Sequence, residues 1–182
     1  MRSSSYAPQT AEALIETIPI SGNLDHFWKD MLELEENGEI IKTRFGTYGL
    51  PEKMGLVVGR FQLTSKGFGF VIPDNKGERP DVFIPPRALG GAMNNDRVMA
   101  RVESSSGGNK PEGEIIRIIT HANNKIVGIF HQSGDFGFVT PDDKRIGQDI
   151  YIMKRHFGGA KTNQKVVAEI TEWPVERRNA EG

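Results

Sequence analysis

Two phenylalanines alternate with glycine in the stretch KGFGF, and the pattern returns in DFGFV further along the chain. Residues two positions apart in an extended strand point to the same face. Phe68 and Phe70 therefore share one face, as do Phe136 and Phe138. A ring on a surface can stack on another flat aromatic group, whereas a ring in a core only packs. Whether these two faces point outward or into a core therefore decides whether the rings can bind a ligand.

The residues between the rings favour an outward direction. Gly67, Gly69 and Val71 fall on the opposite face, and small residues suit the crowded interior of a small β-barrel. Rings on the outside of adjacent strands form a platform on which successive bases of a single strand can stack, at about 1–3 kcal/mol per base. Cations beside such a platform can pair with phosphates or stack on the rings. Burial of the rings inside the barrel is the alternative.

The candidate RNA-binding residues are these rings, their aromatic neighbours and the cations close to them in sequence. In the first segment they are Arg60, Phe61, Lys66, Phe68, Phe70, Phe83 and Arg87, and in the second they are Phe130, Phe136, Phe138, Tyr151, Lys154, Arg155 and His156.

Residues for catalysis are not evident. The absence of cysteine removes thiolate nucleophiles and cysteine-based metal sites. The four histidines have neither metal-ligand nor catalytic-triad spacing. Asp142 and Asp143 form an adjacent carboxylate pair, but neighbouring side chains diverge and the pair sits in a predicted turn. No phosphate-cradling glycine motif is present. We therefore expect this chain to hydrolyse nothing.

Composition sets looser bounds. The formal net charge of the 182 residues is −1, so any basic surface must be local. The lack of cysteine suits a reducing cytoplasm, and no apolar run approaches the roughly 20 residues that span a bilayer. We expect a cytoplasmic protein.

An internal repeat shows which predicted elements carry these motifs. Residues 67–102 align with 135–170 without a gap, and 16 of the 36 pairs are identical, against about two or three for unrelated segments. Within a unit, short β-rich runs alternate with turn residues, which predicts a five-stranded Greek-key barrel of the OB type. The final residues 179–182 align with 110–113, just before the fifth strand of the first unit, so we expect the second barrel to lack its last strand and the natural chain to continue.

The first 53 residues differ in character. Residues 10–18 and 24–34 have helical spacing, and residues 39–50 read as two short strands around a glycine turn, which together predict a winged helix-turn-helix. Because the second helix is acidic and would repel phosphates, a structural or partner-contact role is favoured for it. Lys42 and Arg44, in the predicted hairpin, remain candidates for contact with an RNA backbone. The expected domains are 1–53, 54–122 and 123–182, mainly β with a small α+β N-terminal part.

The stretch KGFGFV followed by DVFI resembles the two ribonucleoprotein motifs of cold-shock domains. Cold-shock proteins usually follow the second motif with histidine and an aromatic residue, where this chain has Pro85-Pro86 and Met153-Lys154. The order of parts is similar instead to the N-terminal half of the bacterial ribonuclease R family. The resemblance implies a processive 3′→5′ exoribonuclease that degrades structured RNA, including RNA with a 3′ overhang, and whose Mg²⁺-binding aspartates lie in a catalytic domain that this chain lacks. It implies no cofactor in the chain itself.

Two other classes stay open on sequence grounds. One is a stand-alone cold-shock-type RNA chaperone or translation factor, against which the incomplete second barrel counts. The other is a DNA-binding regulator led by the helix-turn-helix, against which its acidic helix counts.

Overall fold

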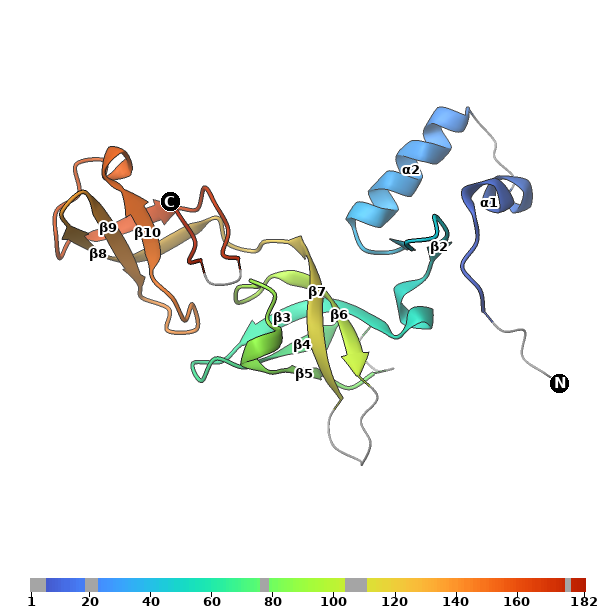
Figure 1. The fold of residues 1–182 in the computed structure, drawn as a ribbon, viewed down its shortest axis with the longest axis horizontal. Coiled ribbons are helices and arrows are strands. Elements are labelled where there is room, and N and C mark those ends of the chain that lie inside the picture. Colours follow the sequence, from blue (N-terminus) through green and yellow to red (C-terminus); the bar gives the residue numbers. More distant parts are fainter. Residues whose placement is uncertain (1–5, 19–22, 76–78, 104–110, 176–177) are drawn as a thin grey trace. The chain divides into compact units, whose positions relative to one another are not determined.

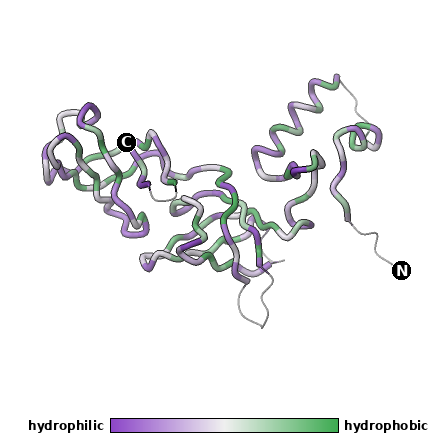
Figure 2. The backbone as a smooth tube through the Cα atoms, in the orientation of Figure 1, coloured by the Kyte–Doolittle hydropathy of each residue, from purple (hydrophilic) through white to green (hydrophobic). Residues whose placement is uncertain are grey.

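The structure is a computed structural model and describes residues 6–18, 23–75, 79–103, 111–175 and 178–182. The chain divides into two compact units, residues 1–58 and 59–182. Hydrophobic and hydrophilic residues interleave along the helices and strands (Figure 2). Among the described residues, no helix is long and apolar enough to cross a membrane.

The first unit contains helix α1 (Ala11–Thr17), helix α2 (Leu24–Glu36) and a hairpin of β1 (Ile41–Lys42) and β2 (Tyr48–Gly49) (Figure 1). A short 3₁₀ helix, η1 (Pro51–Met54), follows. Each helix begins at a capping side chain: Thr10 accepts a hydrogen bond from the Ala13 N–H and Asn23 accepts one from the Asp25 N–H, as helix N-termini require. This is the predicted order of two helices followed by a hairpin.

The second unit begins with a closed barrel in the strand order β3-β4-β5-β7-β6. Its strands are β3 (Leu56–Leu63), β4 (Gly69–Pro73), β5 (Val82–Ile84), β6 (Arg97–Glu103) and β7 (Glu112–Thr120), with the short helix η2 (Pro86–Ala88) after β5. Antiparallel pairs join the strands except where β5 meets β7, which run parallel. The OB-type barrel predicted from the strand order is confirmed.

The rest of the chain repeats this plan in a curled sheet of order β10-β9-β8-β11. The strands are β8 (Lys125–Ser133), β9 (Phe136–Pro141), β10 (Ile150–Met153) and β11 (Lys165–Glu169), with the short helix η3 (Lys154–His156) after β10. Where β7 lies against β5 in the barrel, the last residues lie against β10. The Phe83 N–H donates to the Pro111 carbonyl, and the Tyr151 N–H donates to the Ala180 carbonyl, so the predicted alignment of 179–182 with 110–113 holds for the described residues; Lys110 lies outside them.

Two asparagines repeat the same backbone geometry in both halves. Asn95 and Asn163 have positive φ angles of 72° and 70°, which few residues other than glycine adopt. Each donates its N–H to the carbonyl of a phenylalanine, Phe61 and Phe130 respectively, over 2.8 Å. The turn that leads into β6 is therefore rebuilt in the turn that leads into β11, which supports the duplication seen in the sequence.

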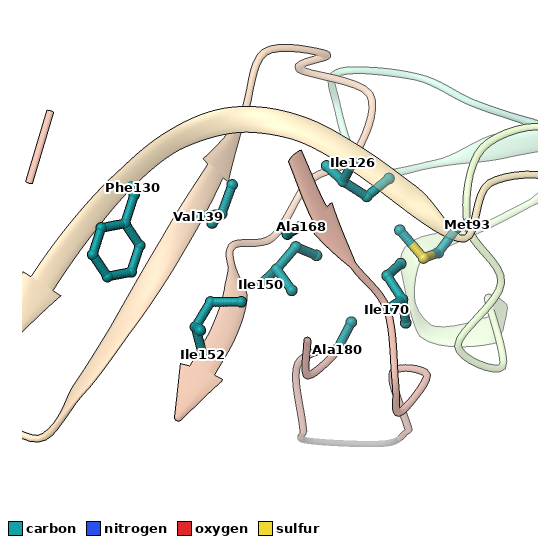
Figure 3. Close-up of a cluster of buried hydrophobic side chains, with 9 residues drawn as sticks. All are labelled: Met93, Ile126, Phe130, Val139, Ile150, Ile152, Ala168, Ile170 and Ala180. Atoms are coloured by element: carbon teal, nitrogen blue, oxygen red, sulfur yellow. The ribbon is translucent and has the colours of Figure 1, made fainter. Parts of the chain in front are cut away.

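The core of the second sheet includes a residue from the first repeat. Met93, in the segment before β6, packs with Ile126, Ile170 and other buried side chains of the second half (Figure 3). His121 also stacks on Trp173, with ring centroids 3.5 Å apart and planes at 6°. The two halves of the second unit are thus joined by packing as well as by the chain.

A buried carboxylate forms hydrogen bonds at the junction between the two halves of the second unit. Asp96 accepts hydrogen bonds from the N–H groups of Met93 (2.8 Å) and Ala122 (3.0 Å), and its Oδ2 lies 2.9 Å from Nδ1 of His121. The Asp96 side chain is fully buried. It accepts hydrogen bonds from the turn before β6 and from the segment that leads from β7 into the second sheet.

Candidate nucleic-acid interface

Three rings gather on the outer face of the barrel, and we call them the first platform: Phe68, Phe70 and Phe83. Phe70 on β4 lies directly opposite Phe83 on β5, and the three ring centroids are 5.6–5.9 Å apart. All three side chains are half-buried, while Gly69 and Val71 between them are buried. The alternation of the sequence thus becomes an inner and an outer face, with the rings outside.

The second glycine of GFGF has a packing reason. A Cβ on Gly69 would collide with the ring of Phe61, which lies across the inner face from β3, and a Cβ on Gly137 would collide with Phe130 in the same way. Gly67 differs, because it has a φ of +83° and open space where a Cβ would stand. The expectation that Gly67 lines the crowded interior is therefore wrong, and this glycine serves the turn before β4.

The predicted set of RNA-binding residues is wrong at Phe61 and Phe130. Their side chains are 0% and 1% exposed and fill the interiors of the two halves, where no base can reach them. Phe61 follows Arg60 directly on β3, and neighbouring residues of a strand point to opposite faces. Since Arg60 points outward, Phe61 must point inward.

Phe136, Phe138 and Tyr151 form the second platform, at the equivalent place on β9 and β10. Tyr151 pairs with Phe138 across the strands. Phe136 lies 5.6 Å from Phe138 and 5.7 Å from Tyr151, the latter in a stacked arrangement at 25°. Phe136 is 37% exposed, and its neighbours are half-buried. The duplication has therefore kept three rings on the outer face of each half.

The cations of the first platform are mostly available. Arg60 points outward on β3 and Lys66 lies in the turn before Phe68; both are exposed. Within the part of the chain that the structure describes, neither has an ion-pair partner. Arg87 on η2 forms an exposed ion pair with Glu112 at 2.9 Å, beside the end of β5. Such exposed pairs are weak and open readily for another anion.

The cations of the second platform have more side-chain and backbone contacts than those of the first. Lys154 donates to Asp135 over 2.6 Å, and this hydrogen bond lowers the pKa of the Asp135 carboxyl. Asp135 therefore stays ionised at neutral pH, and its exposed ion pair with Lys154 is weak, like that of Arg87 with Glu112. Arg155 contacts His156, whose ring lies 3.2 Å from the Gly182 carbonyl oxygen. These two residues lie on η3, beside the C-terminal segment rather than against the rings.

Sequence reasoning missed two side chains on the platform faces. Gln62 lies directly opposite Phe70, and His131 lies directly opposite Phe138. Gln62 is exposed and His131 half-buried. The two positions follow Phe61 and Phe130, so they correspond in the repeat and alternate with the buried rings. Strand alternation applied to β3 and β8 was the signal that could have found them.

A metal-dependent hydrolytic centre does not fit the described residues. They contain no group of three or more His, Cys, Asp or Glu side chains that could hold a metal ion. Asp142 is paired with Lys165, and Asp143 is paired with Arg145, each at 2.8 Å. The hydrogen bonds from Arg145 lower the pKa of the Asp143 carboxyl. Both carboxylates of the adjacent pair thus have cationic partners already.

Comparison with known proteins agrees with this reading of the fold. The family model described as Ribonuclease B OB domain matches residues 59–118, and that of the Cold shock domain matches residues 138–182. The second unit therefore matches an OB domain followed by a cold-shock domain, and each half carries an aromatic platform.

The similar curated proteins indicate one particular family with these domains. Ribonuclease R of Thermotoga maritima is 36% identical over 152 residues, which cover 82% of this chain and 20% of the relative. Ribonuclease R of Escherichia coli K12 is 28% identical over 177 residues, 96% of this chain and 22% of the relative. The chain corresponds to the N-terminal region of ribonuclease R. It spans about a fifth of the length of these curated relatives.

Solved structures share the fold at low sequence identity. RNase R of Mycoplasma genitalium, in complex with ribose-methylated single-stranded RNA, has a TM-score of 0.60 and 18% identity, and the match covers 69% of this chain and 20% of that chain. Yeast Ssd1, described as a pseudonuclease, has a TM-score of 0.59 and 14% identity, covering 100% of this chain and 25% of that chain. At these identities the likeness concerns the fold alone.

Proposed function

We propose that this chain binds single-stranded RNA on its two platforms, as the RNA-guiding N-terminal region of a 3′→5′ exoribonuclease. The observation that carries the proposal is the first platform, in which Phe68, Phe70 and Phe83 gather outside a closed barrel. The exposed cations Arg60 and Lys66 lie next to it. Rings in this position can stack on bases, and the cations can hold the phosphates between them. The solved M. genitalium RNase R, with single-stranded RNA bound, supports the choice of ligand.

The same geometry favours single strands over duplexes. In a duplex the bases already stack on one another, so half-buried protein rings cannot reach a base face without unstacking neighbouring base pairs. Stacking tolerates any base, because every base has a flat face. The Gln62 amide beside Phe70 is placed to hydrogen-bond the edge of a stacked base, which would add a modest sequence preference.

The remaining parts of the proposal concern the whole protein. We place the hydrolytic reaction and its Mg²⁺ in a catalytic domain outside this chain, since the described residues offer no metal cluster. The ribonuclease R relatives support this placement, because the chain spans only about a fifth of their length. We further propose that the substrates include structured RNA with a 3′ overhang and that the protein works in the cytoplasm.

Fluorescence anisotropy with a labelled oligouridine of about 12 nucleotides, a length within the range of OB-fold site sizes, tests the binding. The single strand should bind, and a blunt duplex of equal length should bind at least ten times more weakly. The logarithm of the binding constant should fall with the logarithm of the salt concentration with a slope of about −1 to −3, since only a few cations flank the rings. Equal binding of the duplex, or no binding of the single strand at low salt, would contradict the proposal.

A further inference from the structure

Helix α2 presents two apolar stripes, and only one of them is covered. Phe27 and Met31 pack with Ala11 and Tyr48 in the core of the first unit. Leu24, Trp28 and Leu32 follow one another at intervals of four residues on the adjacent stripe, and they are 52%, 48% and 57% exposed. Because residues four apart lie above one another on a helix, these three side chains form a continuous ridge about 12 Å long. We call it the α2 ridge.

The residues around the α2 ridge are mainly acidic. Helical geometry places Glu35 within the angular span of the ridge, and Asp25 and Glu36 along its outer border. Lys29 is the cation nearest to this border in the helix. Large exposed apolar side chains in a row mark interaction sites more often than scattered ones do, and here the surrounding charge is negative.

This charge argues against three occupants. Phosphates of RNA and the headgroups of anionic lipids would be repelled by the carboxylates. A second copy of the chain would bring the same carboxylates against each other across a two-fold axis. A partner with cations beside an apolar stripe would instead satisfy both features at once. A narrow ridge of residues four apart fits the apolar stripe of another helix.

We propose that the α2 ridge is a docking site for a basic amphipathic helix of a partner protein. The apolar stripe of the partner packs on Leu24, Trp28 and Leu32, and its lysines or arginines pair with the bordering carboxylates. The site belongs to the first unit and the platforms belong to the second, so docking serves to recruit a protein and does not depend on RNA binding.

The test uses a synthetic helical peptide of leucine and lysine, about 18 residues long and so five turns, with leucines in one stripe. A peptide with glutamate in place of each lysine is the matched probe. The chain has two tryptophans, so the two indole N–H signals in a ¹H–¹⁵N spectrum report separately on the ridge (Trp28) and on the domain junction (Trp173). We expect the lysine peptide to shift the Trp28 signal and not the Trp173 signal, and the glutamate peptide to shift neither.

Two double variants measure how much the apolar side chains of the α2 ridge and the carboxylates beside it contribute to peptide binding. Leu24→Gln with Leu32→Gln should weaken peptide binding at least tenfold, and because both side chains are exposed the helical content should not change. Glu35→Gln with Glu36→Gln should weaken binding several-fold and reduce its dependence on salt. Both variants should bind oligouridine like the unaltered chain.

Several results would overturn the proposal. Equal binding of the two peptides would show that charge does not select the partner, and no binding of the lysine peptide would show that the ridge does not accept a basic helix. A Trp28 signal that responds to oligouridine would make the ridge an RNA contact. Self-association in sedimentation runs that Leu24→Gln with Leu32→Gln removes would make the occupant a second copy of the chain.

Discussion

Replacing Phe68 and Phe70 by alanine removes two of the three rings of the first platform and leaves the barrel interior intact. Phe61, Val71 and Ile84, which fill the inner face, are not touched. Each ring that stacks on a base contributes about 1–3 kcal/mol. The two rings contact each other at 5.9 Å, so their contributions are not independent. We expect a combined loss of about 2–4 kcal/mol, which weakens oligouridine binding roughly 30- to 1,000-fold.

The matched control is Phe136→Ala with Phe138→Ala, the same change at the equivalent positions of the second half. The loss there should be smaller, because the Asp135 carboxylate stands beside those rings and holds Lys154 in an ion pair. Anisotropy titrations at one salt concentration compare the two variants directly. Circular dichroism melts confirm that each is folded at the titration temperature, since the rings are half-buried and their loss costs some stability.

One result would refute the stacking role of the first platform. If the folded Phe68→Ala, Phe70→Ala variant binds oligouridine as tightly as the unaltered chain, these rings do not carry the affinity. If the second pair costs more than the first, the ordering of the two platforms argued from Asp135 is wrong even though stacking remains.

Three further changes test the charges and the packing around the platforms. Asp135→Asn releases Lys154 and removes a negative charge beside the rings, so oligouridine should bind several-fold more tightly, with a steeper salt dependence in the same titrations. Gly69→Ala forces a methyl group against the ring of Phe61 and the backbone carbonyl of Gln62, and it should lower the free energy of unfolding by about 1–3 kcal/mol in urea melts; an unchanged midpoint would show that both the ring and the strand backbone can shift. Asp96→Asn replaces an acceptor oxygen by an NH₂ group among several donors and should cost about 1–3 kcal/mol in the same melts, whereas full stability would mean that these donors find other partners.

The repeat and the strand order could be predicted because they depend on local patterns. Alternation of phenylalanine with glycine and valine identified the two faces of β4 and β9, and turn residues marked the ends of most strands. The fifth strand of the first repeat was expected just after residue 113, and it begins at Glu112. The faces and the ends of the strands follow from residues close together in the sequence.

The incorrect site predictions concern β3, the strand that pairs with β4. Arg60 and Phe61 were both predicted to bind RNA, although adjacent residues on a strand cannot share a face. Which of the two points inward depends on the register with β4, where Gly69 leaves room for the ring of Phe61. That register is set by the turn between β3 and β4, which strand alternation on β3 would have resolved. The stacking of His121 on Trp173 is a long-range contact that no local pattern predicts.

Met93 shows that the unit of duplication and the unit of folding differ. It belongs by sequence to the first repeat, and the equivalent position of the second repeat holds the exposed Lys161. Yet Met93 contributes to the buried cluster around Ile126 and Ile170 (Figure 3). A chain cut between the repeats would therefore leave an opening in the core of its second half, and the two halves should unfold in one cooperative transition rather than one after the other. The two repeats share one strand plan, yet through this methionine the core of the second half depends on a residue of the first.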